Sequence, residues 1–260
     1  MKLKKLIFLI AFLIGLQQIV LAGATAAEVY ELVKETKRAS GDTVWPGFDP
    51  LAFTVLKGTD LHFSPEPNNP ESQVFMMLSS DYFAKYTLEQ NLASTVHEAF
   101  HGFERSPRRK GKKWRYENPM LVFEYEGTSA RNNALFSIEA GLLNEALGAK
   151  DDATLRKLVR DFLMVRELRQ KELDPRFAEF EKGAELNEGL AEYAGTKAVI
   201  EAFRTNAAKN TGLKFDASNA SEYVLKMYYT LGSINRMGSN VRRKFYYTGS
   251  AQGLLLDRLM

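Results

Sequence analysis

Apolar residues recur every three or four positions over much of this chain, and that period predicts a mainly helical protein. Besides the run described next, five segments show this spacing: residues 27–39, 129–147, 151–173, 176–204 and 221–237. Pro175 marks the break between two of them, because proline cannot continue a helix.

The run from Tyr86 to Arg105 has the clearest helical pattern. Thr87 is placed to cap the first turn, and no proline interrupts the run. Its apolar side chains form one stripe, with three steps of four residues and one of three: Leu88, Leu92, Val96, Phe100 and Phe103. We therefore predict an amphipathic helix here, with a half-buried edge beside the apolar stripe.

Three short segments near the N-terminus predict strands. They are Ala52–Leu56, Asp60–Phe63 and Val74–Leu78, and a loop at Pro65–Pro70 divides the last two. A small N-terminal sheet followed by a mainly helical body is an α+β fold. Val74–Leu78 is either a strand that offers its backbone to an extended peptide or part of the buried sheet core, and both interpretations stay open.

The first 24 residues have the pattern of a signal peptide. Lys2, Lys4 and Lys5 precede the apolar stretch Leu6–Leu16, and Ala22-Gly23-Ala24 resembles a cleavage site. Because two glutamines at positions 17 and 18 interrupt the apolar run, we expect no stable membrane anchor after processing. The sequence predicts export to the periplasm or the extracellular space, with residues 25–260 forming a single domain.

Composition excludes several classes of function. Residues 1–24 carry three lysines and no acid, so the formal net charge of +3 falls to zero without them. The rest of the chain therefore gives no reason to expect a nucleic-acid partner. The absence of cysteine excludes disulfides and thiol catalysis.

Two of the three histidines lie in the pentapeptide His97-Glu98-Ala99-Phe100-His101, beside the apolar stripe of the predicted helix. Histidines four residues apart share one helix face. Two neutral imidazoles there can hold one Zn²⁺ ion, and Glu98 can act as general base on a water molecule. The alternative is a pair of partly buried polar residues. His62 falls in a predicted loop or short strand.

A hydrolytic zinc site needs three protein ligands, and without cysteine the natural third ligand is a carboxylate. Glu188 and Glu192 lie four residues apart on one face of a predicted helix. We predict that Glu188 is the third ligand and that Glu192 accepts the free ring N–H of a ligand histidine. The small residues Gly189, Ala191 and Gly195 would let the two helices approach closely. The alternative is a solvated acidic helix face.

Together, HExxH and the downstream segment Asn187–Ala191 resemble the gluzincin group of zinc metallopeptidases, which includes thermolysin-like enzymes and the alanyl-aminopeptidase type. Residues 187–191 read NEGLA, which is similar to the NEGxA form of the second gluzincin motif. The resemblance implies a zincin-like fold, zinc ligands His97, His101 and Glu188, and Glu98 as the catalytic base.

The chain departs from the best-known gluzincins in two respects. The 86 residues from 102 to 187 separate the two motifs, far more than in thermolysin, and we expect a helical insertion over about residues 117–183. No GxMEN-like segment precedes the first motif, so an aminopeptidase specificity is not supported.

Gluzincins commonly place a tyrosine or histidine where it can stabilise the oxyanion. By this resemblance Tyr247 and Tyr246 are candidates, with Tyr228 and Tyr229 behind them. The alternative is that the tyrosines are packed aromatics before a helix beginning near Gly249 and Ser250.

Basic residues concentrate between positions 105 and 115. This loop either contacts acidic substrates or an anionic envelope surface, or it is simply solvated. Arg131 can bind a substrate carboxylate or form a structural ion pair, and we favour the ion pair. The basic residues of 151–173 are expected to be solvated or paired with nearby acids.

These observations lead to one hypothesis and two alternatives. We expect a secreted zinc peptidase that acts on peptides or proteins, with Glu98 moving the proton. The first alternative is a catalytically inactive zincin-like protein that binds an envelope partner. The second is a helical scaffold without metal.

Overall fold

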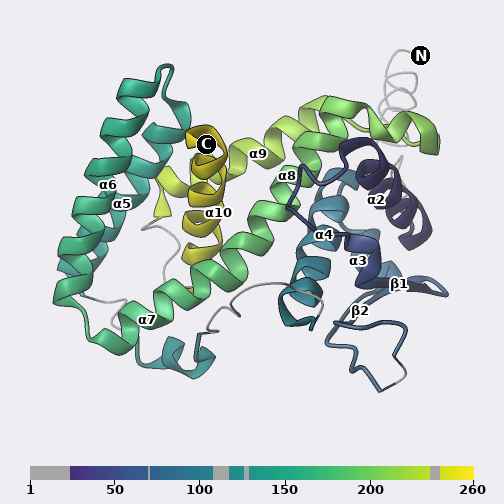
Figure 1. Ribbon diagram of the computed structural model, residues 1–260, viewed down its shortest axis with the longest axis horizontal. Coiled ribbons are helices and arrows are strands. Elements are labelled where there is room, and N and C mark those ends of the chain that lie inside the picture. Colours follow the sequence, from purple (N-terminus) through teal and green to yellow (C-terminus); the bar gives the residue numbers. More distant parts are fainter. Residues whose placement is uncertain (1–23, 70, 108–116, 126–128, 235–240) are drawn as a thin grey trace, which may run out of the picture.

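The computed structural model describes residues 24–69, 71–107, 117–125, 129–234 and 241–260. It is mostly helical, with one small antiparallel sheet, as the α+β prediction requires (Figure 1). Nearly all of the predicted signal peptide and most of the basic loop at 105–115 lie outside the described residues. Within the described ranges, no helix has the length and apolar character needed to cross a membrane.

The N-terminal part combines three helices with the sheet. Helices α2 and α4 pack together beside it, and the short α3 leads into α4. Their bounds are α2 Ala26–Ser40, β1 Thr54–Lys57, β2 Asp60–Phe63, β3 Met76–Leu78, α3 Ser80–Phe83 and α4 Leu88–Arg105. The strands run in the order β1-β2-β3, with His62 opposite Val55 on one side and Met77 on the other.

The remainder of the chain is helical. Its elements are a 3₁₀ turn Pro119–Phe123, α5 Ala130–Gly148, α6 Asp152–Glu172, α7 Pro175–Ala184, a π turn Glu185–Gly189, α8 Leu190–Thr205, a 3₁₀ turn Ala207–Thr211, α9 Ala217–Gly232 and α10 Val241–Leu259. Helices α5 and α6 form a hairpin at one end of the molecule, opposite α2 and the sheet (Figure 1). α8 continues from α7 through the π turn and lies against α4.

Two clusters of buried apolar residues hold these parts together. The first includes α2, the sheet, α4 and the inner face of α8. The second includes α5, α6, α7 and α10. The π turn connects helix α7 of the second cluster to helix α8 of the first. A side chain on this turn can therefore meet residues from both clusters.

Several predicted boundaries are wrong in an instructive way. The last helix begins at Val241, not near Gly249, so Tyr246 and Tyr247 lie inside it. The first strand begins at Thr54 because residues 50–52 form a 3₁₀ turn, with Pro50 at its first position. The predicted helix 176–204 is interrupted by the π turn, which a 3.6-residue period cannot reveal.

Candidate metal centre

Helix α4 positions both histidines, because its first turn is capped and one of its faces is buried. Two reciprocal hydrogen bonds cap its first turn. The backbone N–H of Gln90 donates to the side-chain oxygen of Thr87, and the backbone N–H of Thr87 donates to the side-chain oxygen of Gln90. His97 and His101 are 8% and 5% exposed, so both imidazoles are withdrawn from solvent on the inner side of the helix.

Close approach of α8 to α4 depends on a glycine, as the sequence predicted. A Cβ atom built on Gly195 would lie 2.6 Å from the carbonyl oxygen of Ala93 in α4. Gly189 allows close packing against a different helix, α10, because a Cβ atom on Gly189 would lie 2.5 Å from the Cα atom of Gly249. The two glycines therefore let α8 pack closely on α4 and the π turn pack closely on α10.

Three acceptor atoms converge between α4 and the π turn. Nε2 of His97 and Nε2 of His101 are 3.2 Å apart, and each is 3.4 Å from Oε2 of Glu188. A tetrahedral Zn²⁺ with bonds of about 2.0–2.1 Å places its ligand atoms about 3.3–3.4 Å apart. The three residues form a buried group that can hold a metal ion. Both the spacing and the donor set fit zinc.

Carboxylates on the far side of each imidazole fix the ring orientation. Nδ1 of His97 lies 3.3 Å from Oε2 of Glu192, and Nδ1 of His101 lies 2.9 Å from Oε2 of Glu104. With Nδ1–H facing a carboxylate, each ring directs the lone pair of Nε2 into the centre. Glu192 has the predicted position. The role of Glu104 was missed, although its place three residues after His101 on the same helix face was visible in the sequence.

The second oxygen of Glu188 is held by an arginine from α10. Arg242 donates to Oε1 of Glu188 at 2.6 Å and also pairs with buried Glu117. Asn187 donates to the same oxygen of Glu188 at 3.3 Å. One oxygen of Glu188 is thus bound by cationic and amide donors, which leaves the other directed at the imidazoles. Neither Arg242 nor Glu117 was predicted, since only the tertiary fold brings them here.

The electrostatics of the centre favour a cation. Burial lowers the pKa of His97, but contacts with Glu188 and Glu192 outweigh burial and raise that pKa to about 10. Burial favours the neutral form of Glu188, yet the hydrogen bonds from His101 and His97 hold its pKa far below the ordinary value. Negative charge therefore accumulates around the two rings, and a metal ion would satisfy it as a proton does.

Glu98 and one tyrosine border the ligands. Glu98 is half-buried and makes no hydrogen bond with the part of the chain that the structure describes. The ring of Tyr246 stacks on that of His97, with centroids 5.7 Å apart. Burial, and then the negative charge of Glu188, raise the pKa of Tyr246, so its hydroxyl remains a donor. Tyr247 is buried within the second apolar cluster and also lines the pocket described next.

A pocket of about 440 Å³ opens near the candidate metal ligands. Glu192, Arg242 and Tyr246 belong both to its wall and to the surroundings of the histidines. Tyr86 and Tyr223 also line it. The pocket therefore adjoins the metal-ligating group through these three shared side chains, while His97, His101, Glu188 and Glu98 are not among its lining residues.

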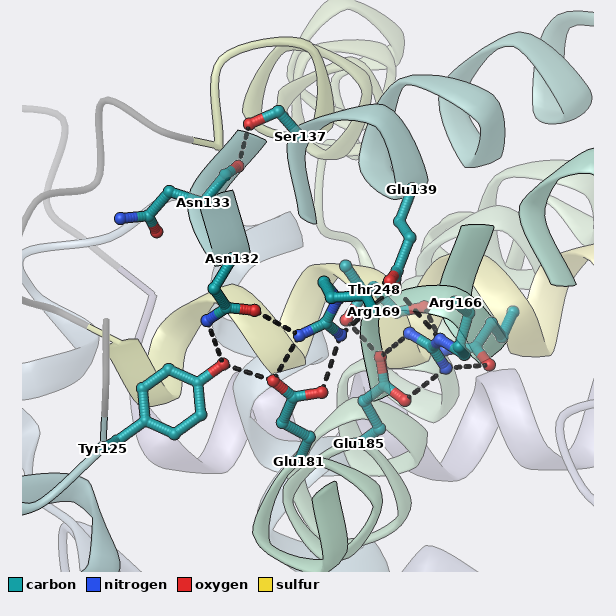
Figure 2. A network of polar contacts seen from close by, with 11 residues as sticks. Tyr125, Asn132, Asn133, Ser137, Glu139, Arg166, Arg169, Glu181, Glu185 and Thr248 are labelled. Atoms are coloured by element: carbon teal, nitrogen blue, oxygen red, sulfur yellow. Dashed lines mark hydrogen bonds and ion pairs between the residues drawn. The ribbon is translucent and has the colours of Figure 1, made fainter. Parts of the chain in front are cut away.

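A buried ionic network anchors the π turn from the opposite side (Figure 2). Glu185, three residues before the candidate ligand Glu188, accepts two hydrogen bonds from Arg166 at 2.8 and 2.6 Å. Thr248 of α10 donates to the same carboxylate at 2.6 Å. Arg169 is 1% exposed and bridges two buried carboxylates, those of Glu139 and Glu181. Arg166 and Arg169 are therefore paired with acids, one of the two outcomes expected for the basic residues of α6, and these acids come from α5, α7 and the π turn.

Other residues considered from the sequence lie elsewhere. His62 sits on β2 and does not belong to the metal-ligating group. Arg131 forms a two-point ion pair with Glu172, as favoured by the sequence. Tyr229 is 75% exposed. The side chain of Tyr228 lies outside the described part of the chain.

Comparisons with protein-family models, with curated proteins and with solved structures gave no match.

Proposed function

We propose that this protein is a zinc-dependent peptidase. The observation that carries the proposal is the convergence of two imidazole Nε2 atoms and one carboxylate oxygen at 3.2–3.4 Å, beside Glu98 and an accessible pocket. His97, His101 and Glu188 would hold the zinc ion. Two histidines and one glutamate are the ligand set of zinc peptidases that leave a fourth position open.

Glu98 is the general base in this proposal. It follows His97 directly on α4, and no described residue occupies its carboxylate with a hydrogen bond. It would take a proton from the attacking water and pass it to the leaving amine. A bound zinc ion would supply Lewis acidity, lowering the pKa of water and polarising the peptide carbonyl.

Tyr246 is our candidate for stabilising the negative charge that develops on the carbonyl oxygen. The sequence named both tyrosines, with Tyr247 first, but Tyr246 is the one that stacks on His97 and whose hydroxyl lies within 3.5 Å of Arg242. A protonated phenol next to a fixed guanidinium is a suitable donor for an oxyanion.

Strand β3 is the candidate for aligning an extended substrate. It forms one edge of the described sheet, and Met76 and Met77 are 40% and 48% exposed. These exposures do not fit a strand of the buried sheet core. They support the interpretation in which β3 offers its free backbone groups to a peptide. We propose that the peptidase acts after export, as the pattern of residues 1–24 indicates.

The test combines metal analysis with peptide digestion. The full chain is expressed with its leader, and the processed protein is recovered from the exported fraction. Its zinc content is then measured. It is incubated with a mixed peptide library, with and without chelator, and the cut bonds are identified by mass spectrometry. Bound zinc with chelator-sensitive cleavage that Glu98→Gln abolishes is the expected result. Zinc without cleavage would instead support the inactive binding protein, and no metal would support the scaffold.

A further inference from the structure

The pocket beside the metal centre has a chemical character of its own. Helices α9 and α10 supply basic residues to its wall, namely Lys226, Arg242 and Arg243. The acid among its lining residues is Glu192. Tyrosines make up much of the remaining surface. This combination differs from the mainly apolar lining expected of a pocket for aliphatic side chains.

Two of the four charged residues that line the pocket already have partners. Arg242 is already paired with Glu117 and Glu188. Glu192 is engaged by the imidazole of His97 and by the hydroxyl of Tyr223, at 3.3 and 3.0 Å.

The other two charged residues that line the pocket are Lys226 and Arg243. Both are exposed and line the pocket, and neither forms an ion pair with any residue in the described ranges, although the charge of Arg243 helps to lower the pKa of Glu192. Two positive charges are therefore available to a ligand in the pocket.

We propose that this pocket binds a carboxylate of the peptide substrate, next to the bond that is cut. Arg243 would meet the carboxylate with its planar fork, and Lys226 would add a second positive charge. The carboxylate is either an acidic side chain or the free C-terminus of the peptide. This inference rests on the proposed peptidase function for its choice of ligand.

Binding can be measured without turnover. The zinc-loaded Glu98→Gln variant is titrated with a labelled octapeptide of alanine and glycine that carries one central glutamate. Its glutamine counterpart is the neutral probe, and each peptide is used as the C-terminal acid and as the amide. We expect a carboxylate at the recognised place to tighten binding by about tenfold or more, with the gain shrinking as salt is added. If replacing glutamate by glutamine weakens binding, the pocket recognises the side-chain carboxylate. If amidation weakens binding, it recognises the C-terminal carboxylate.

Variants then assign the effect to the pocket. Lys226→Gln combined with Arg243→Gln should remove the preference for the carboxylate and leave binding of the neutral amide unchanged. Arg160→Gln is the matched control, because Arg160 is an exposed arginine of α6 without an ion pair in the described chain. Circular dichroism of each variant verifies folding. Equal binding of all four peptides, or a preference that survives the double substitution, would overturn the inference.

The two proposals fail in distinguishable ways. Selective carboxylate binding by Glu98→Gln, together with no hydrolysis of the library by the parent protein, would reject the peptidase and keep the anion pocket. Hydrolysis by the parent protein without any selectivity would reject the pocket and keep the peptidase.

Discussion

Replacing Gly195 by alanine tests whether the spacing between α4 and α8 sets the metal site. The new methyl group would lie 2.6 Å from the carbonyl oxygen of Ala93. Carbon and oxygen atoms in close contact sit about 3.3 Å apart or more, so the helices must separate locally by about 0.7 Å. Glu188 and Glu192 lie two turns and one turn before this contact, and both would move with α8.

The displacement is large compared with what a metal site tolerates. Zinc ligand distances vary by about 0.2 Å around their usual values, so a shift of this size should weaken zinc binding by about 10- to 100-fold. Overpacking costs about 1–3 kcal/mol, and alanine in place of glycine returns about 1 kcal/mol of helix propensity. We therefore expect Gly195→Ala to lower the free energy of unfolding of the metal-free protein by up to about 2 kcal/mol.

Two assays with a matched control decide the outcome. Zinc affinity is measured by competition with a chromophoric chelator, and stability by urea unfolding of the metal-free protein. Gly141→Ala is the control, since a Cβ atom at Gly141 in α5 meets nothing within 4 Å. It should stabilise the helix by about 1 kcal/mol and leave zinc affinity unchanged. Parental zinc affinity in Gly195→Ala would refute the argument that helix spacing positions the ligands.

Further substitutions test individual roles. Glu98→Gln should keep zinc and lose turnover by about 100-fold or more, and hydrolysis at the parental rate would exclude Glu98 as the base. His101→Ala should lose the metal on dialysis, and a full equivalent of zinc in the variant would contradict the ligand set. Glu104→Gln should weaken zinc binding by about 10- to 100-fold in the competition assay, whereas unchanged affinity would show that Glu104 does not orient His101. Arg166→Met leaves the carboxylate of Glu185 buried with the hydroxyl of Thr248 but without its cationic partner, and should cost about 3–5 kcal/mol in urea unfolding; parental stability would show that the pair contributes nothing net.

The parts of the site that follow from local periodicity were predictable from sequence. His97 and His101 share a face because they lie four residues apart on an amphipathic helix, and the cap at Thr87 was visible. Glu188 was predicted from spacing and chemistry, without knowledge of the π turn that carries it. Its convergence with the histidines required two helices to pack closely, and Gly195 was a usable signal for that.

The parts that depend on tertiary packing were not predictable. Arg242 reaches Glu188 across 54 positions of sequence, and Glu117 reaches Arg242 across 125. Arg169 looks like any other charged residue of α6, yet it is buried between two carboxylates. Charge patterns along one helix report which residues are polar, but they do not report which other helix will cover them.

The π turn at Glu185–Gly189 holds one residue more than the regular helix would need there. Deleting a single in-frame codon from this stretch would let the chain run on as an ordinary α-helix. If the codon is that of Gly189, Glu188 would take the place of the deleted residue, about 100° further round the helix axis, because each residue of an α-helix turns through that angle, while α7 and α8 would keep their orientation. The carboxylate of Glu188 would swing away from the imidazoles while the apolar residues of both helices survived. One codon in the gene thus separates a metal-binding geometry from an inert bundle of helices.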